Sequence, residues 1–220
     1  MGRLRKFYGS MVGKKVVMGV TGLIGIGFVI LHSLGNLLVF RGPEAINSYS
    51  HFLKSTGELL WTLRVVLFLA VILHVVAAIQ LTRQSRAARP IGYTKREAQV
   101  ATIASRTMRW GGALLLVFIV VHILHFTTGN IRPAGVFSRE DVYANVVTSF
   151  RIWWVTLFYV VAMVALGLHL FHGAWSSVRS IGVSPPSPQP LHRRLSLVIA
   201  VFVWAAFTAV PVAVFSGIVR

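Results

Sequence analysis

The sequence predicts an all-α integral membrane protein, a bundle of five transmembrane helices. Hydrophobic residues make up 55% of the 220 residues, and the mean hydropathy is +0.73. About 20 apolar residues suffice to cross the hydrocarbon core of a bilayer. Five stretches of that order contain no Asp, Glu, Lys or Arg: 16–40, 65–82, 110–131, 152–178 and 195–219. Because only short connections remain between them, residues 1–220 are expected to form a single transmembrane domain.

The expected helices follow these stretches with small extensions. The second stretch is the shortest, and its helix can begin at Leu59 because the long side chain of Arg64 can snorkel to the interface. The first stretch is too long and too glycine-rich for a cleavable signal, and no A-x-A site follows it. The five helices are expected over 16–40, 59–82, 108–131, 152–178 and 195–219.

The connecting segments differ in composition. The segment 41–60 contains the run AINSYSHFL, which is expected to form a short helix at the membrane interface. The segment 83–109 is polar and basic, and 132–151 contains the acidic pair Glu140-Asp141. The proline-rich run SPPSPQP within 181–194 is typical of a stiff, extended connector.

The charge distribution predicts the orientation of the bundle. The net charge is +17, with 15 Lys and Arg on the side of the N-terminus and seven on the other. Cytoplasmic loops of membrane proteins carry such an excess. We therefore expect a multi-pass protein of the inner (cytoplasmic) membrane with its N-terminus in the cytoplasm, its C-terminus outside and no nucleic-acid partner. The basic loops also suit contact with anionic membrane lipid or a docked protein.

Four of the expected helices carry a histidine nine or ten residues before the next arginine. These histidines are His32, His74, His122 and His169. At 1.5 Å per residue, each lies about 14 Å from the arginine that flanks its helix. Because the first and third helices run outward, His32 and His122 form an outer pair, and His74 and His169 form an inner pair. For a core about 30 Å thick, the two pairs are expected to differ in depth by about 10 Å.

Histidines inside a membrane indicate function, because imidazole is costly there. A single one is usually a hydrogen-bonding group within the bundle, but four at matched depths are what two haems require, each held between two histidines. The absence of cysteine excludes covalent C-x-x-C-H haem attachment, an iron–sulfur cluster and a thiol nucleophile in this chain. The sequence therefore predicts a bundle enclosing two stacked, non-covalent b haems, with His32, His122, His74 and His169 as iron ligands.

Other residues are weaker candidates for the cofactor sites. His125 and His172 each follow a predicted ligand by three residues on the same helical face, but at a different depth. We expect them to contact haem propionates or quinone. Arginines near the helix ends are further candidates for cofactor contacts: Arg64, Arg106, Arg109 and Arg179.

Two polar residues of the segment 41–60, His51 and Glu58, are candidates for handling the protons of a quinone. Exposed polar residues of a loop are, however, usually only solvated. Four glycines of the first helix also have two interpretations, close approach of a porphyrin or tight helix packing. They are Gly19, Gly22, Gly25 and Gly27.

Several motifs resemble those of the diheme cytochrome b subunits of succinate dehydrogenases and fumarate reductases. They are HSLGNLLVF, INSYSHFL, LLWTLR, LHVVAAIQLT, RAARPIGY, HILHF and HLFHGAWSS, and the resemblance they carry extends over nearly the whole chain. The resemblance implies a five-helix, single-polypeptide membrane anchor in which His32 and His122 bind the distal haem and His74 and His169 the proximal haem. Some menaquinol-oxidising members carry a glutamate near the position of Lys54, so this chain departs from that pattern.

The resemblance implies a subunit of an enzyme rather than an enzyme that acts alone. A flavoprotein subunit would oxidise succinate, an iron–sulfur subunit would pass electrons to this chain, and menaquinone or another quinone would accept them. The dicarboxylate site would lie outside this chain, and the complex could assemble into a higher oligomer. Physiological operation in the fumarate reductase direction stays open.

Other functions also remain open on the residues. The haem b subunit of a nitrate reductase, formate dehydrogenase or hydrogenase, and the cytochrome b of a quinol:cytochrome c reductase, are redox alternatives. One histidine on each of four helices argues against the nitrate reductase and cytochrome c reductase patterns, which place their ligands on two helices. A transporter or proton channel with a histidine relay is the non-redox alternative, and it predicts a colourless protein.

Overall fold

The computed structural model of the chain describes residues 2–88, 103–183 and 190–220. Regular structure within these ranges is helical. Its elements are α1 (Arg3–Gly9), α2 (Met11–Asn36), the 3-10 helix η1 (Leu37–Arg41), α3 (Pro43–Ser55), α4 (Glu58–Ala87), α5 (Ile103–His122), the π-helix η2 (Ile123–Thr127), α6 (Val142–Phe150), α7 (Trp153–Ser180) and α8 (Pro190–Phe215).

Within the described ranges, five helical segments are long and apolar enough to cross a membrane. They are Met11–Arg41, Glu58–Ala87, Ile103–Thr127, Trp153–Ser180 and Leu191–Phe215. Large apolar side chains on them are exposed, among them Leu31, Phe68 and Val198, each more than 60% exposed. Such continuous apolar surface is typical of contact with lipid rather than water. The all-α architecture with five spans is thus confirmed for a multi-pass membrane protein.

The helix limits differ from the predicted ones at several ends. The first span begins at Met11 rather than 16, because Ser10 caps it by accepting a hydrogen bond from the Gly13 amide at 3.0 Å. The third begins at Ile103 and ends at Thr127 rather than 131, shortly before Gly129 adopts a φ of +68°. The fifth covers Pro190–Phe215 rather than 195–219. The basic run 89–102 and most of SPPSPQP lie outside the described residues.

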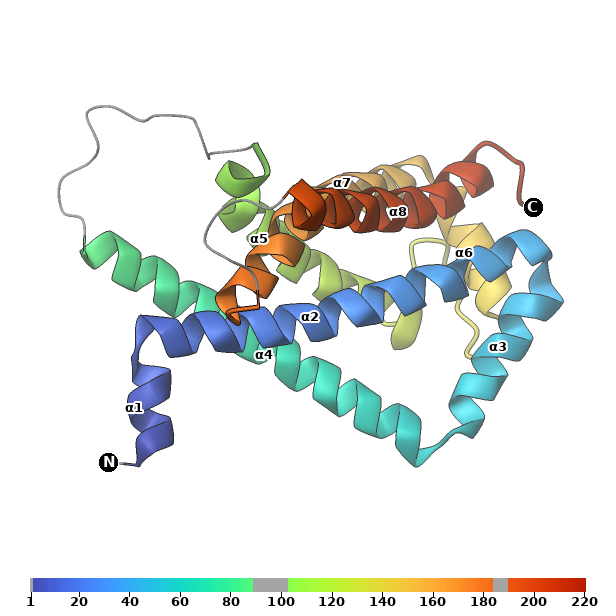
Figure 1. Cartoon of the computed structure of the whole chain (residues 1–220). Coiled ribbons are helices and arrows are strands. Elements are labelled where there is room, and N and C mark those ends of the chain that lie inside the picture. The colour runs from blue at the N-terminus through green and yellow to red at the C-terminus, as the bar shows by residue number, and fades with distance from the viewer. Residues whose placement is uncertain (1, 89–102, 184–189) are drawn as a thin grey trace.

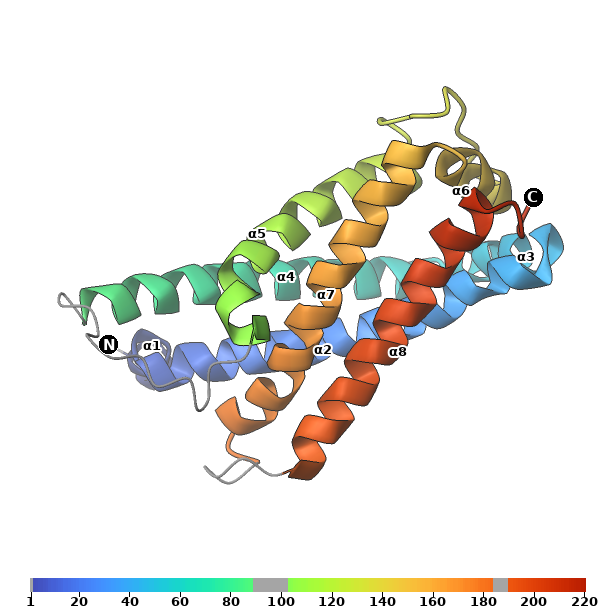
Figure 2. The same cartoon turned by 90° about the horizontal axis from the view of Figure 1, so that it is seen from above.

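Helix α2 lies at the centre of the bundle, where it packs against α4, α7 and α8, while α7 also packs against α5 and α8 (Figures 1 and 2). Small residues permit the close approach. A Cβ on Gly22 would lie 3.2 Å from Ser177 Oγ, and one on Gly19 would lie 3.3 Å from the Ser177 carbonyl oxygen. These two glycines therefore serve helix packing, whereas Gly25 and Gly27 have open space where a side chain would be.

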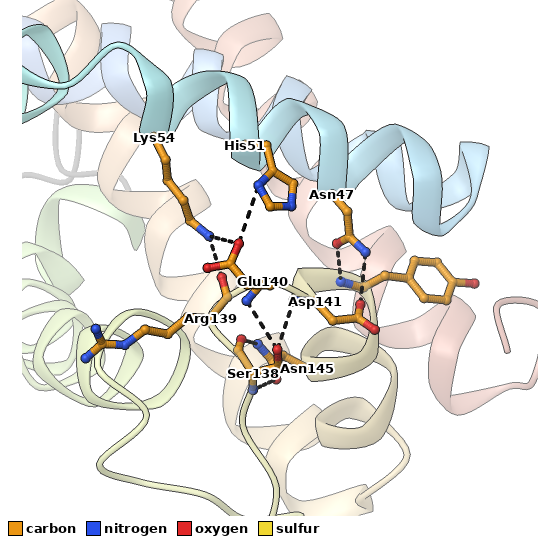
Figure 3. A network of polar contacts seen from close by, with 9 residues as sticks. Asn47, His51, Lys54, Ser138, Arg139, Glu140, Asp141 and Asn145 are labelled. Atoms are coloured by element: carbon orange, nitrogen blue, oxygen red, sulfur yellow. Dashed lines mark hydrogen bonds and ion pairs between the residues drawn. The ribbon is translucent and has the colours of Figure 1, made fainter.

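Helices α3 and α6 cover one end of the bundle, here called the α3–α6 end; the N-terminus lies at the other end and the C-terminus at this one (Figure 1). Asn47 joins the two helices, because its amide donates to Asp141 at 3.0 Å and accepts from the Tyr143 amide at 3.1 Å (Figure 3). Asp141 also caps α6 by accepting from the Ala144 amide at 2.9 Å. These hydrogen bonds, first that of Ala144 and then that of Asn47, lower the pKa of Asp141.

The larger hydrophobic core lies at the α3–α6 end. It is built from buried residues of several elements: Val39, Ile46, Val146, Val147, Phe150, Val155, Tyr159, Val210, Ala213, Val214 and Val219. A smaller cluster of Leu170, Ala200 and Val203 lies between α7 and α8. The short interfacial helix predicted within 41–60 is α3, whereas α6 was not predicted from the sequence.

Candidate haem-binding histidine pairs

The structure brings the four predicted ligands together in two pairs. The ring centres of His32 on α2 and His122 on α5 are 5.9 Å apart, and their planes are inclined by 76°. The ring centres of His74 on α4 and His169 on α7 are 6.2 Å apart, at 58°. All four rings are partly buried. The predicted pairing of helices therefore matches the juxtaposition in the fold.

The separations fit two imidazoles on opposite sides of one metal ion. Two metal–nitrogen bonds of about 2 Å, plus the distance from each nitrogen to its ring centre, place the ring centres roughly 6 Å apart. Among the described residues, no group of three or more His, Cys, Asp or Glu side chains could hold a metal ion. Axial ligation of a haem needs only two histidines, because the porphyrin supplies the other four nitrogens.

The two pairs lie at different levels along the bundle. Helices α2 and α7 each give the same number of residues between these levels. On α2, the ring of His74 reaches the level of Gly22, ten residues from His32. On α7, Tyr159 contacts His122 and lies ten residues from His169. Ten residues of helix correspond to about 15 Å. The distance along a helix is an upper limit on the difference in depth, so the predicted difference of about 10 Å stays a prediction.

His74 is held by the backbone of α2. Its Nδ1 lies 3.1 Å from the carbonyl oxygen of Met18 and 3.2 Å from Thr21 Oγ1. The Thr21 hydroxyl itself donates to the Val17 carbonyl at 2.7 Å. An Nδ1–H that donates to the Met18 carbonyl fixes the tautomer and leaves Nε2 available as a metal ligand. Thr21 and Met18 were not predicted as part of the site, since nothing in the local sequence relates them to His74.

His169 has unused bonding capacity. Its Nδ1 is buried without a hydrogen-bond partner. The side chain also lines a cavity of about 310 Å³ between α5 and α7, together with Gly111, Leu114 and Ala165. A buried imidazole nitrogen without a partner, beside an apolar cavity, fits a site that a bound group completes.

Aromatic rings surround the other pair. Phe28 stacks on His32 at 5.3 Å, and Phe118 stacks on His122 at 5.6 Å. Phe207 from α8 approaches His32 at 5.5 Å. These rings limit the motion of both imidazoles and surround them with apolar surface, as a haem pocket requires.

His125 is occupied by protein contacts. It is 4% exposed, its Nδ1 lies 3.0 Å from the Tyr159 hydroxyl, and its Nε2 lies 2.9 Å from Ser149 Oγ. Both ring nitrogens are thereby used, so the structure gives no support to the predicted contact with a propionate or quinone. Tyr159 and Ser149 come from α7 and α6, and sequence reasoning missed both.

The remaining candidates for cofactor contacts lie near the helix ends. His172 packs edge-on against Trp175 at 5.5 Å, and its Nδ1 is buried without a hydrogen-bond partner. The guanidinium groups of Arg64 and Arg179 lie over Trp61 and Trp175, at 5.1 and 5.2 Å. Arg106 and Arg109 are exposed in the first turns of α5. Their contact with propionates stays a prediction.

His51 and Glu58 are not brought together by the fold. His51 Nδ1 lies 3.4 Å from Glu140 Oε2, and Lys54 Nζ lies 3.6 Å from the same oxygen (Figure 3). Lys54 also donates to the Arg139 carbonyl. Glu58 is exposed in the first turn of α4, where a negative charge favours the helix start. The groups beside His51 are therefore Glu140 and Lys54.

One comparison with known proteins gives a match along most of the chain. The succinate dehydrogenase cytochrome b558 subunit of Bacillus subtilis (strain 168) is 26% identical over 193 residues, which cover 86% of this chain and 88% of that protein. No family model and no solved structure matches. With five apolar spans and four paired histidines, this similarity confirms the predicted resemblance of the chain to the cytochrome b membrane anchors of succinate dehydrogenases.

Proposed function

We propose that this chain is the membrane-anchor cytochrome b subunit of a succinate:quinone oxidoreductase and holds two non-covalent b haems. The observation that carries the proposal is the pair of ring separations, 5.9 and 6.2 Å, between histidines from four different helices. His32 and His122 would hold one haem, and His74 and His169 the other. When bound, the haems would supply one-electron transfer between an iron–sulfur subunit and a quinone.

The chain's own residues would orient the ligands and exclude water. The Met18 carbonyl would keep the Nδ1 proton of His74 on the side away from the metal. Phe28, Phe118 and Phe207 would keep the other pair dry. Arg106, Arg109 and Arg179 lie at the end nearer to His169 and could pair with propionates there.

The end opposite to the α3–α6 end would face the cytoplasm and the two soluble subunits. Exposed basic residues gather there at the starts and ends of several helices: Arg3, Arg5, Lys6, Lys15, Arg83, Arg86, Arg106, Arg109, Arg193 and Arg194. An excess of positive charge at one end supports this orientation in the inner membrane. In the purified complex, crosslinks to the iron–sulfur subunit are expected from Lys15. Crosslinks from Lys54 alone would place that subunit at the wrong end.

Quinone, as menaquinone or another type, would react at the α3–α6 end. His51, Glu140 and Lys54 are the exposed titratable groups grouped there, and Glu58 is nearby in sequence. They could deliver or accept the protons that accompany quinone reduction and oxidation.

The direct test is a haem count. The purified chain, or the complex that contains it, is expected to hold two b haems per chain, all extracted by acidified acetone. Succinate should reduce haem in the complex, and a flavoprotein and an iron–sulfur subunit should copurify with it. A ratio near one, covalently retained pigment or a colourless protein would contradict the proposal. Two haems that succinate does not reduce would favour a formate dehydrogenase, hydrogenase or another respiratory complex.

A further inference from the structure

A chain of four polar side chains from four elements, α5, η2, α6 and α7, ends at His122. The Tyr159 hydroxyl lies 3.5 Å from His122 Nδ1 and 3.0 Å from His125 Nδ1, and His125 Nε2 lies 2.9 Å from Ser149 Oγ. We propose that Tyr159, His125 and Ser149 form a hydrogen-bond relay that positions the His122 imidazole and lowers the midpoint potential of the haem it ligates. This inference rests on the proposed function.

Each member of the relay can donate in one direction only. If His122 Nε2 binds iron, its Nδ1 carries a proton and can donate to the Tyr159 oxygen. The Tyr159 hydroxyl then donates to His125 Nδ1, which must accept. His125 therefore carries its proton on Nε2 and donates it to Ser149 Oγ. One ligand bond at His122 thus determines the tautomer of both histidines.

The relay is enclosed and has little freedom to rearrange. Ser149, Tyr159 and His125 are 5%, 6% and 4% exposed. Phe118 and Phe150 pack edge-on against the Tyr159 ring, at 5.1 and 5.0 Å. Because water does not compete for these groups, the hydrogen bonds are stronger than they would be at a surface.

A π-helical segment places His125 in the relay. The regular α5 ends at His122, and His125 lies in η2, where π turns replace α turns. Such segments occur frequently at functional sites. In the other pair, His169 and His172 lie in an uninterrupted helix, and the Nδ1 atoms of both lack a hydrogen-bond partner. The relay is therefore a feature of one histidine pair.

The effect on the midpoint potential follows from the hydrogen bond that the Tyr159 oxygen accepts from Nδ1–H of His122. A hydrogen bond accepted from the ligand imidazole makes the imidazole a stronger base and favours the more positively charged, oxidised metal. Removing the acceptor should therefore raise the midpoint potential. It should also let the ring turn about its axis, which alters the low-spin electron paramagnetic resonance spectrum of the ferric form.

The test is Tyr159→Phe in the purified holo-complex, because phenylalanine keeps the ring and removes only the hydroxyl. Both haems should be retained, one haem should shift to a more positive midpoint potential with a changed resonance spectrum, and the other should stay unchanged. Tyr143→Phe is the matched control, since that hydroxyl donates to the Arg220 carbonyl at 2.8 Å and takes no part in the relay. It should shift neither haem.

Ser149→Ala should give a smaller shift of the same haem in the same direction, because it acts through two intervening groups. Retention of both haems with unaltered potentials and spectra in Tyr159→Phe would overturn the relay and leave the proposed function intact. Loss of one haem in His125→Gln with two haems retained in His122→Gln would show that His125 is the ligand, which also overturns the relay. A wild-type complex without haem would instead defeat the proposed function.

Discussion

The His32–His122 pair is surrounded by aromatic rings and connected to a relay of side chains, whereas His74 is fixed by a backbone carbonyl of α2. The first pair lies at the end of the bundle that holds the larger hydrophobic core. The second lies beside a cavity, and its His169 has an unpaired Nδ1. Side chains can be replaced one at a time, but a carbonyl cannot. The surroundings of the first pair should therefore respond to many single substitutions, and those of the second mainly to changes in helix packing.

The largest expected effect separates the two pairs directly. His32→Ala or His122→Ala should remove one haem and spare the other, so that about half of the pigment is lost. His74→Ala or His169→Ala should remove the other haem. Quantified haem and the reduced-minus-oxidised spectrum of each purified variant give the answer. Loss of the same haem in all four variants would contradict the assignment of two pairs.

A packing substitution should break the second pair alone. The Cβ in Gly22→Leu would lie 3.4 Å from His74 Cε1 and 3.2 Å from Ser177 Oγ, so the larger side chain must displace α4 or α7. We expect the haem of the His74–His169 pair to be lost and the other to be retained. Val20→Leu is the matched control, because it enlarges a side chain of the same helix that is 45% exposed, and it should retain both haems. Equal haem loss in the two variants would argue against close packing at Gly22 as the cause.

The α6 cap should contribute moderately to stability at the α3–α6 end. Asp141→Ala removes an N-cap and should cost about 1 kcal/mol, seen as a lower melting temperature in detergent. Because hydrogen bonds lower the pKa of Asp141 in the folded state, its contribution is fully present above the unfolded pKa of about 4. It is lost as the pH falls through the folded pKa. The charge-dependent part of the difference between variant and wild type should therefore be constant near neutral pH and vanish in acid, so that the total difference decreases; a total difference unchanged in acid would contradict this account.

The smallest expected effects concern the surface groups around Glu140. The His51 and Glu140 side chains are 56% and 68% exposed, so His51→Ala should change stability by less than about 1 kcal/mol. If His51 or Glu58 handles quinone protons, His51→Ala and Glu58→Gln should lower quinone-linked turnover. Dye reduction by succinate and both haem spectra should stay intact. Unchanged turnover in both variants would leave these residues as ordinary surface groups.

The sequence predicted the elements whose signal is local and periodic. The apolar spans are recognised by their length, and the four paired histidines by their number of residues from the flanking arginine. Both quantities can be counted along a single helix. Contacts between residues of different helices could not be predicted by counting along the sequence. Nothing near His122 indicates that Tyr159 approaches it, and nothing near His125 indicates that Ser149 does. Likewise, nothing near His74 indicates that the Met18 carbonyl approaches it.

The sequence also does not determine which polar groups meet. His51 and Glu58 were named together as polar residues of the segment 41–60, but the side chain that lies beside His51 is Glu140. His125 was assigned to a cofactor by its spacing from His122, yet Tyr159 and Ser149 occupy both of its nitrogens. The helix α6 was missed because its nine residues lie in a segment marked by proline, glycine and acidic residues.

The hydrogen bond between His74 and the Met18 carbonyl can form only in one axial register of α4 against α2. A displacement of one helical turn, about 5.4 Å, would carry the ring past that carbonyl and past the glycine opposite it. Helices α2 and α4 must therefore pack in the correct register before the imidazole can face His169. Haem binding by the His74–His169 pair would then depend on the correct packing of α2 against α4. A variant that lacks this haem although both histidines are intact would indicate that the two helices pack one turn out of register.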